Sequence, residues 1–174
     1  LNFDINKFKK FKDKIIYIVL DKQPNNIEEI LKEDSEKQKN NKYIYNAVKR
    51  ENLHRNSLSK GLEKADENDF ILISDVDEIP KLDKINLSKI NNKIVLFNQK
   101  IYCYKFNLQQ DEHIWCGTKA CRKKNLISPQ WLRNVKDRNY PFWRIDTMFS
   151  NKKYSNMFIV NDGGWHFSNI KSPE

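Results

Sequence analysis

The sequence predicts an α/β domain with a central, mostly parallel sheet. Three observations lead to this prediction: one apolar run precedes a helical segment, a second apolar run follows it, and paired aspartates stand directly after the second run. A strand, a helix and a strand in this order imply a right-handed parallel crossover. The length of 174 residues fits a single domain, residues 1–174.

The crossover is expected from three segments in chain order. The apolar run at residues 14–20 is short and rich in β-branched residues, as in a strand covered on both faces of a parallel sheet. Residues 24–42 are polar, and we expect a loop with at most a weak helix. Residues 43–65 then have the spacing of an amphipathic helix, and Phe70–Ile73 is the second apolar strand.

The same apolar patterns predict four further elements beyond Pro80. Residues 94–108 and 115–122 have strand character, residues 125–135 indicate a short helix, and residues 157–160 indicate a last strand.

Composition and charge exclude several classes of protein. The net charge of +9 would attract any polyanion, but the excess is Lys interleaved with Asn and Ile, which favours a solvated surface over a nucleic-acid interface. The three cysteines lack a Cys-x-x-Cys spacing, so we expect reduced thiols and no thiolate zinc site. There is no apolar run long enough for a membrane span and no signal-peptide core, so we expect a cytoplasmic protein.

Asp75 and Asp77 carry the chemistry that we expect at the exit of the second strand. Two carboxylates in one small volume need a cation, and Mg²⁺ and Mn²⁺ prefer few protein carboxylates plus water and phosphate oxygens. The arrangement therefore suits a metal-bridged diphosphate, although aspartates after a buried strand also cap turns. The crossover would place Arg55 near Asp75, where it could bind phosphate or instead pair with Glu51 on the helix. Asp21, at the exit of the first strand, is expected to contact the nucleoside.

The paired aspartates also have to be compared with the motifs of other protein classes. A calcium-binding EF-hand loop beginning at Asp75 would need Gly in place of Pro80 and Glu in place of Asn86, so it fails. A haloacid-dehalogenase-like phosphohydrolase would use the first Asp as nucleophile, but usually continues with other residues where this chain has Glu78 and Ile79. It remains the alternative enzyme, and a non-catalytic module that binds a nucleotide or polyanion is the alternative of another class.

Two motifs resemble blocks of glycosyltransferase family 17, the β-1,4-N-acetylglucosaminyltransferases. They are Ser74-Asp-Val-Asp-Glu-Ile-Pro80 and Gly164-Trp-His-Phe-Ser168, and weaker resemblance lies in Glu51-Asn-Leu-His-Arg-Asn56, Trp115-Cys-Gly-Thr118 and Leu132-Arg133. His54 departs from the family pattern, which usually has Gln there. The resemblance implies a GT-A-like nucleotide-sugar-binding domain, and we expect it to be incomplete at both ends.

The resemblance also implies a reaction and its site residues. A UDP-N-acetylglucosamine donor would transfer its sugar, with inversion, to a glycan or polysaccharide acceptor, with Mn²⁺ or Mg²⁺ as cofactor. Asp77 would be the main metal ligand, Asp75 a second ligand or a partner of the donor ribose, and His166 a further ligand that closes the site. Trp165 would contact the donor, as Trp115 could, although aromatic residues are more often part of the core. An N-glycan acceptor would instead place the protein in the Golgi lumen, with its membrane anchor outside this chain.

An inverting displacement also needs a general base near the acceptor. Spacing alone cannot choose among the candidate carboxylates. Glu174 is preferred because it stands in a family-like Pro-Glu block, and the other candidates are Glu78, Asp111, Glu112 and Asp162.

Overall fold

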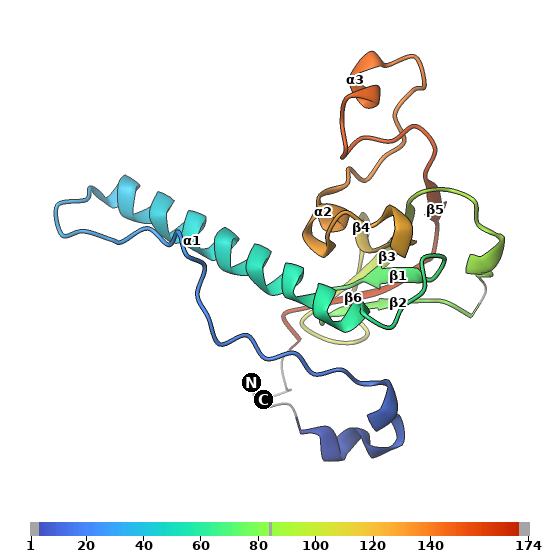
Figure 1. The fold of residues 1–174 in the computed structure, drawn as a ribbon, viewed down its shortest axis with the longest axis horizontal. Helices are drawn as coiled ribbons and strands as arrows, with labels where there is room; N and C mark the ends of the chain where they lie inside the picture. Colours follow the sequence, from blue (N-terminus) through green and yellow to red (C-terminus); the bar gives the residue numbers. More distant parts are fainter. Residues whose placement is uncertain (1–3, 84, 171–174) are drawn as a thin grey trace. The chain divides into compact units, whose positions relative to one another are not determined.

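The computed structural model describes residues 4–83 and 85–170 of the chain (Figure 1). They group into two compact units, residues 1–64 and residues 65–174. The first unit contains a 3-10 helix (Ile5–Lys14), the long helix α1 (Glu36–Ser57) and a second 3-10 helix (Leu58–Leu62). The second unit contains all the strands.

Helix α1 begins at a capping box. The backbone N–H of Gln38 donates to the Ser35 hydroxyl at 3.4 Å, and the Gln38 side chain accepts from the backbone N–H of Ser35 at 2.9 Å. These two bonds satisfy donors that the helix itself leaves unpaired. The helix therefore starts at Glu36, inside the segment predicted as a loop, because the cap compensates for a polar first turn.

Polar contacts hold the preceding extended segment against α1. The Asn46 amide accepts from the backbone N–H of Glu28 at 2.9 Å and donates to the Glu28 carbonyl at 2.7 Å. Lys42 pairs with Asp34 at 2.6 Å. Asn46 is the one buried residue among the described residues of this unit. Hydrogen bonds and ion pairs, more than apolar burial, therefore define the first unit.

The strand predicted at residues 14–20 is wrong. This run forms no strand, and Ile16, Tyr17 and Val19 are exposed. An apolar run becomes a strand only where a neighbouring chain segment pairs with its backbone. Among the described residues, the strand pairs are formed by segments of residues 70–168, and residues 14–20 are not part of the sheet.

The second unit is built on a six-stranded sheet with the order β1-β4-β3-β6-β2, and β5 also pairs with β3. Pairs β1–β4, β3–β4 and β2–β6 are antiparallel, whereas β5 and β6 run parallel to β3. The strands are β1 (Phe70–Ile73), β2 (Glu78–Pro80), β3 (Val95–Cys103), β4 (Gln109–Arg122), β5 (Phe158–Val160) and β6 (Gly164–Ser168). The remaining helices are α2 (Pro129–Asn134), α3 (Ile145–Met148) and 3-10 turns at Leu87–Lys89 and Lys123–Asn125.

The predicted mostly parallel sheet and its crossover are also wrong, although the mixed α/β class is confirmed. Strand β1 pairs antiparallel with β4, with Phe70 opposite Arg122. The continuous apolar sequence of β1 does not come from a parallel sheet. It arises because both faces of the strand are covered by other parts of the second unit. Phe70 and Leu72 pack on a core cluster that contains Phe97, while the other face carries the buried Ile71 and contacts α2. The apolar sequence of a strand therefore indicates that both of its faces are buried, but it does not indicate whether the strand runs parallel or antiparallel to its neighbours.

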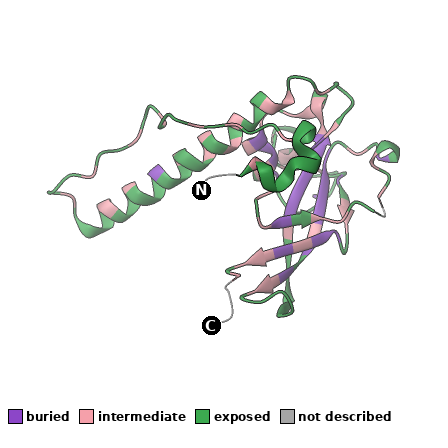
Figure 2. Ribbon diagram, turned by 90° about the horizontal axis from the view of Figure 1, so that it is seen from below, coloured by how far each residue is buried: buried purple, intermediate pink, exposed green. Residues whose placement is uncertain are grey.

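Buried residues gather on the central strands (Figure 2). Strand β1 is confirmed as predicted, and the last predicted strand is confirmed as β5. The strand predicted at 94–108 ends at Cys103 and the one predicted at 115–122 begins at Gln109, because the two form a hairpin. The helix predicted at 125–135 is α2 alone, begun by the Ser128 cap and Pro129. Strands β2 and β6, which carry the site, were not predicted.

Candidate active site

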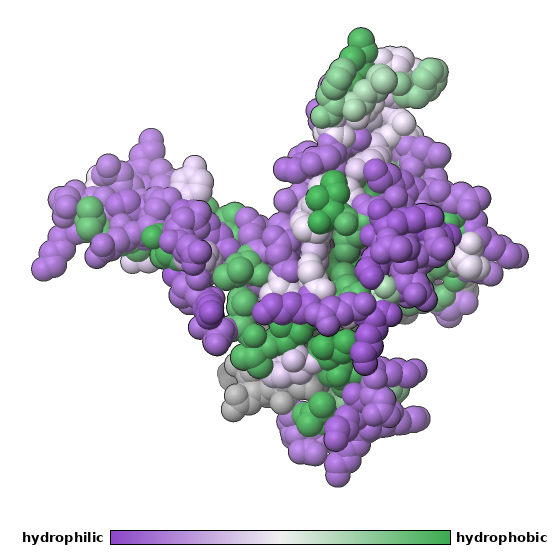
Figure 3. Space-filling model, in the orientation of Figure 1, coloured by the Kyte–Doolittle hydropathy of each residue, from purple (hydrophilic) through white to green (hydrophobic). Residues whose placement is uncertain are grey.

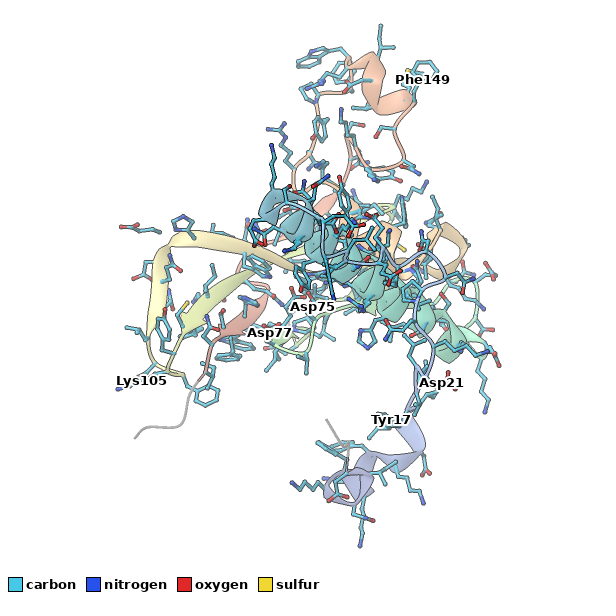
Figure 4. The ribbon with its side chains drawn as sticks, turned by 90° about the vertical axis from the view of Figure 1, so that its left-hand side faces the viewer. Tyr17, Asp21, Asp75, Asp77, Lys105 and Phe149 are labelled. Atoms are coloured by element: carbon cyan, nitrogen blue, oxygen red, sulfur yellow. The ribbon has the colours of Figure 1, made fainter. Side chains whose placement is uncertain are left out.

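The paired aspartates lie in the turn between β1 and β2, and Figure 4 labels both. The backbone N–H of Glu78 donates to the Asp75 carbonyl at 3.0 Å, and the backbone N–H of Asp75 donates to the Glu78 carboxylate at 3.0 Å. The fully exposed Val76 forms the tip of this turn. Asp75 and Glu78 therefore fix each other, and Asp77 is presented between the tip and β2.

Arg133 of α2 joins the two carboxylates that close the turn. Its guanidinium donates to both oxygens of Glu78 at 2.9 Å and to the Asp75 carboxylate at 3.0 Å, and it also reaches the Gly117 carbonyl at 2.6 Å. The Glu78 side chain is fully buried, and only 9% of the Arg133 side chain is exposed. Burial lowers the pKa of Arg133, but the hydrogen bonds and charge of Glu78, with Asp75, outweigh it and leave that pKa raised. Asp75 is thus held by a buried cation.

Trp115 and His166 form the wall beside this network. The indole N–H of Trp115 donates to Glu78 at 2.8 Å, and its ring stacks on the His166 ring with centroids 4.5 Å apart. The β2–β6 register sets Glu78 opposite His166. The Nδ1 atom of His166 is buried, lacks a hydrogen-bond partner and lies 3.8 Å from a carboxylate oxygen of Asp77.

Asp77 and His166 are the residues that fit a divalent cation. The buried Nδ1 of His166 lacks a hydrogen-bond partner and lies beside a partly exposed carboxylate, so the two side chains could both contribute ligands to a cation. Asp75 is committed to Arg133. Within residues 4–83 and 85–170 no group of three or more His, Cys, Asp or Glu side chains forms a complete metal site. Two protein ligands suit Mg²⁺ or Mn²⁺ where phosphate oxygens and water complete the shell.

A second layer of buried polar groups lies behind the aspartate turn. The Ser74 hydroxyl lies 2.6 Å from that of Thr118, which accepts from the Gln99 amide at 3.2 Å. A Cβ on Gly117 would stand 1.8 Å from the side-chain amide oxygen of Gln99, so any larger residue there would displace the Gln99 side chain. Sequence reasoning missed Gln99 and gave no role to Thr118 or Arg133, although both lie in family-like blocks. A polar residue within an apolar strand does indicate a buried hydrogen bond. It does not indicate which residue on another element is the partner.

Of the other predicted site residues, Arg55 and Asp21 belong to the first unit and Trp165 to the second. Arg55 pairs with Glu51 at 2.5 Å on α1, and the crossover that would have placed it near Asp75 is not formed. Asp21 lines a pocket of about 670 Å³ within the first unit, with Leu53 and Lys60 at its edge. Trp165 precedes His166 on β6 and so faces the opposite side of the sheet, with the Lys81 ammonium 5.8 Å from its ring centroid. Glu174 lies outside the described residues.

The candidate bases differ in the hydrogen bonds and ion pairs that their carboxylates already make. Both oxygens of Glu78 already accept hydrogen bonds in a buried site. Asp162 pairs with Lys100 at 3.1 Å and Lys81 at 3.2 Å, and the hydrogen bonds from these two lysines lower its pKa. Asp111 and Glu112 are exposed on β4.

The family comparison matches nearly the whole chain, residues 2–170, to a family of enzymes that transfer sugars. The class of protein is therefore a glycosyltransferase, which works on a sugar donor and an acceptor. The chain belongs to glycosyltransferase family 17. No match was found among curated proteins or among solved structures.

Proposed function

We propose that this glycosyltransferase moves N-acetylglucosamine from UDP-N-acetylglucosamine to a glycan acceptor, with inversion and with a divalent cation at Asp77 and His166. The observation that carries the proposal is the unpartnered, buried Nδ1 of His166, which lies 3.8 Å from the Asp77 carboxylate. The donor sugar rests on the motifs that resemble β-1,4-N-acetylglucosaminyltransferases.

The surrounding side chains support separate roles for the two aspartates. Arg133 holds the Asp75 carboxylate at 3.0 Å and neutralises its charge, whereas Asp77 lies 3.8 Å from the unpartnered Nδ1 of His166. Trp115 stacks on His166 and so fixes the plane of the imidazole ring. A bound cation would neutralise the diphosphate that departs with UDP. The protein would thus hold the cation with Asp77 and His166, and would hold Asp75 toward the donor.

The acceptor side of an inverting reaction requires a carboxylate that can take a proton from the attacking hydroxyl. Glu78 is unsuited to this role because Arg133 and Trp115 occupy both of its oxygens in a buried site. Among the described candidates, Asp111 and Glu112 of β4 are exposed, and Asp111 accepts a hydrogen bond from the Gln109 side chain. We therefore favour one of these two, or the preferred Glu174, as the base.

Calorimetric titration with UDP tests the cation site. UDP should bind in the presence of Mn²⁺ and fail to bind in the presence of a chelator, and Asp77→Asn should abolish the Mn²⁺-dependent binding. Asp83→Asn, an exposed carboxylate that takes no part in the site, is the matched control and should bind as the wild type does. Equal affinity in Asp77→Asn and wild type would contradict the site assignment.

The linkage of the product tests the reaction. With UDP-N-acetylglucosamine and a panel of oligosaccharides, proton coupling at the new anomeric centre should show a β linkage, because direct displacement inverts an α-linked donor. An α-linked product would exclude this mechanism. Hydrolysis of simple phosphomonoesters without sugar transfer would favour the phosphohydrolase alternative, and metal-dependent UDP binding without turnover would favour the binding module.

A further inference from the structure

The 141–153 lobe, which is residues 141–153 with α3 at its centre, exposes an unusual amount of apolar side chain. Phe142 is 81% exposed, Trp143 70%, Ile145 71%, Met148 79% and Phe149 86%. The space-filling view shows this lobe as an apolar projection from the second unit (Figure 3), and Phe149 lies at its outer end in Figure 4. Clustered exposed residues of this size mark an interaction surface.

The base of the lobe is built into the fold. The backbone N–H of Lys136 donates to the Lys152 carbonyl at 2.8 Å, and that of Tyr140 donates to the Tyr154 carbonyl at 2.9 Å. The buried Trp131 donates its indole N–H to the Asn151 carbonyl at 2.6 Å. These hydrogen bonds therefore fix both ends of the lobe to the rest of the second unit.

The polar groups of the lobe are paired internally. Asp146, its one carboxylate, accepts two hydrogen bonds from Arg144 at 2.8 Å and one from Lys153 at 2.7 Å. Those bonds, from Arg144 first and then Lys153, lower the pKa of Asp146 to about 2. Arg144 and Lys153 also lie over the Tyr140 ring. The carboxylate is thus neutralised by its neighbours and offers little repulsion to an anionic surface.

Basic residues surround the apolar tip. Residues 136–153 contain five Lys or Arg against two Asp, and the whole chain has a net charge of +9. An apolar tip with a Trp and a basic collar is the composition of segments that lie in the interface of anionic bilayers. No helix in the described part of the chain has the length and apolarity to cross a membrane, so contact would be made at the surface.

We propose that the 141–153 lobe binds the surface of an anionic lipid bilayer. The apolar side chains, with Trp143 and Phe149 among them, enter the boundary between headgroups and acyl chains, while Arg138 and Lys152 contact lipid phosphates. The proposal rests on the lobe alone and does not depend on the transferase assignment. Charge favours this partner over a second copy of the chain, whose lobe would bring the same basic collar into contact.

Vesicle co-sedimentation of the full chain tests the proposal. The chain should sediment with mixed phosphatidylcholine–phosphatidylglycerol vesicles and remain in solution with pure phosphatidylcholine vesicles. Trp143 fluorescence should be quenched by brominated phosphatidylcholine in the mixed vesicles, and Trp143→Phe should remove that quenching. Phe149→Ser should weaken binding by about tenfold or more, because burial of an aromatic side chain is lost.

A matched pair of charge variants separates lobe binding from general attraction to the basic chain. Lys152→Gln should weaken vesicle binding by about fivefold. Lys105→Gln makes the same charge change on an exposed residue that Figure 4 shows far from Phe149, and should leave binding nearly unchanged. Equal losses in the two charge variants, unchanged binding of Phe149→Ser, or no preference for anionic vesicles would each overturn the proposal. The proposal would also be overturned if the lobe made the chain dimerise in solution, and if this dimer persisted on vesicles and kept Trp143 away from the brominated lipid.

Discussion

Arg133 donates hydrogen bonds to two carboxylates that stand only three positions apart in the chain, Asp75 and Glu78. Asp75, Asp77 and Glu78 bring three negative charges into one turn. Without a buried cation, the burial of Glu78 beside Asp75 would be strongly unfavourable. At the residue scale, the geometry of the aspartate turn therefore depends on a side chain from α2.

Replacing Arg133 should destabilise the second unit strongly. Arg133→Gln leaves the buried Glu78 carboxylate without a counter-charge, so we expect a loss of about 3–5 kcal/mol in the free energy of unfolding, measured by urea denaturation. The double variant Arg133→Met with Glu78→Met removes both charges and should recover most of that loss. Exposed ion pairs contribute less than about 1 kcal/mol to stability. A loss of unfolding free energy in that range for Arg133→Gln would therefore show that the network is solvated.

The half-buried Cys116 and the buried Cys121 should be unreactive at neutral pH. Burial raises the pKa of Cys116 to about 11 and that of Cys121 to about 12, from an ordinary value of 9.0. At pH 8 only about a thousandth of Cys116 is thiolate, so alkylation by iodoacetamide should be slow in the native chain and fast in urea. Between about pH 9 and pH 11 the native state holds protons that the unfolded state releases, so stability should fall as pH rises. Rapid native labelling of both cysteines at pH 8 would contradict this.

At the element scale, the short pair β2–β6 brings the site together. Strand β2 follows the aspartate turn, and β6 delivers His166 opposite Glu78. The pair is closed by Gly164, which has a φ of +133° and lies opposite Pro80. A Cβ at Gly164 would stand 2.0 Å from the Ile79 carbonyl oxygen. The backbone of β6 can approach β2 only because this residue is glycine.

Gly164→Ala should therefore disturb the site through its strand. The substitution meets a backbone atom at a φ that alanine avoids, so we expect a loss of about 1–3 kcal/mol or more in unfolding free energy together with weaker Mn²⁺-dependent UDP binding. Gly61→Ala is the matched control, because its new Cβ would meet only the end of the Ile18 side chain at 3.5 Å. It should leave both quantities nearly unchanged. Equal unfolding free energies and equal UDP binding in the two variants would show that β6 and β2 can move apart without harm to the site.

At the scale of the whole molecule, the two units differ in how much they bury. The first unit has Asn46 as its one buried residue among those described, whereas the second has fully buried Phe97, Leu96 and Leu132. Segments with few buried apolar contacts open at low free energy. The sheet should therefore be the last part of the chain to lose its structure.

Hydrogen exchange followed by mass spectrometry should show this difference. Amides of α1 should exchange through local opening, while amides of β3 and β4 should exchange only through global unfolding and should respond to denaturant accordingly. Urea at concentrations below the unfolding transition should leave α1 exchange rates nearly unchanged and accelerate those of β3. Equal protection of α1 and β3 would mean that the first unit is held by contacts beyond its own.

The sequence by itself determined the enzyme family and the strand before the aspartates, because local motifs and apolar runs carry that information. The cation site at the aspartates stays a prediction. Asp77 and His166, both assigned to the cation from motifs, lie 3.8 Å apart in the structure. The tertiary structure alone decided the direction of the strands, the absence of a strand at residues 14–20 and the part of Arg133. Those features depend on which segments pair across long stretches of chain, such as β1 with β4, and an apolar run is the same whichever neighbour it finds. The buried ion pair that fixes Asp75 joins residues 58 positions apart, and no local pattern records such a contact.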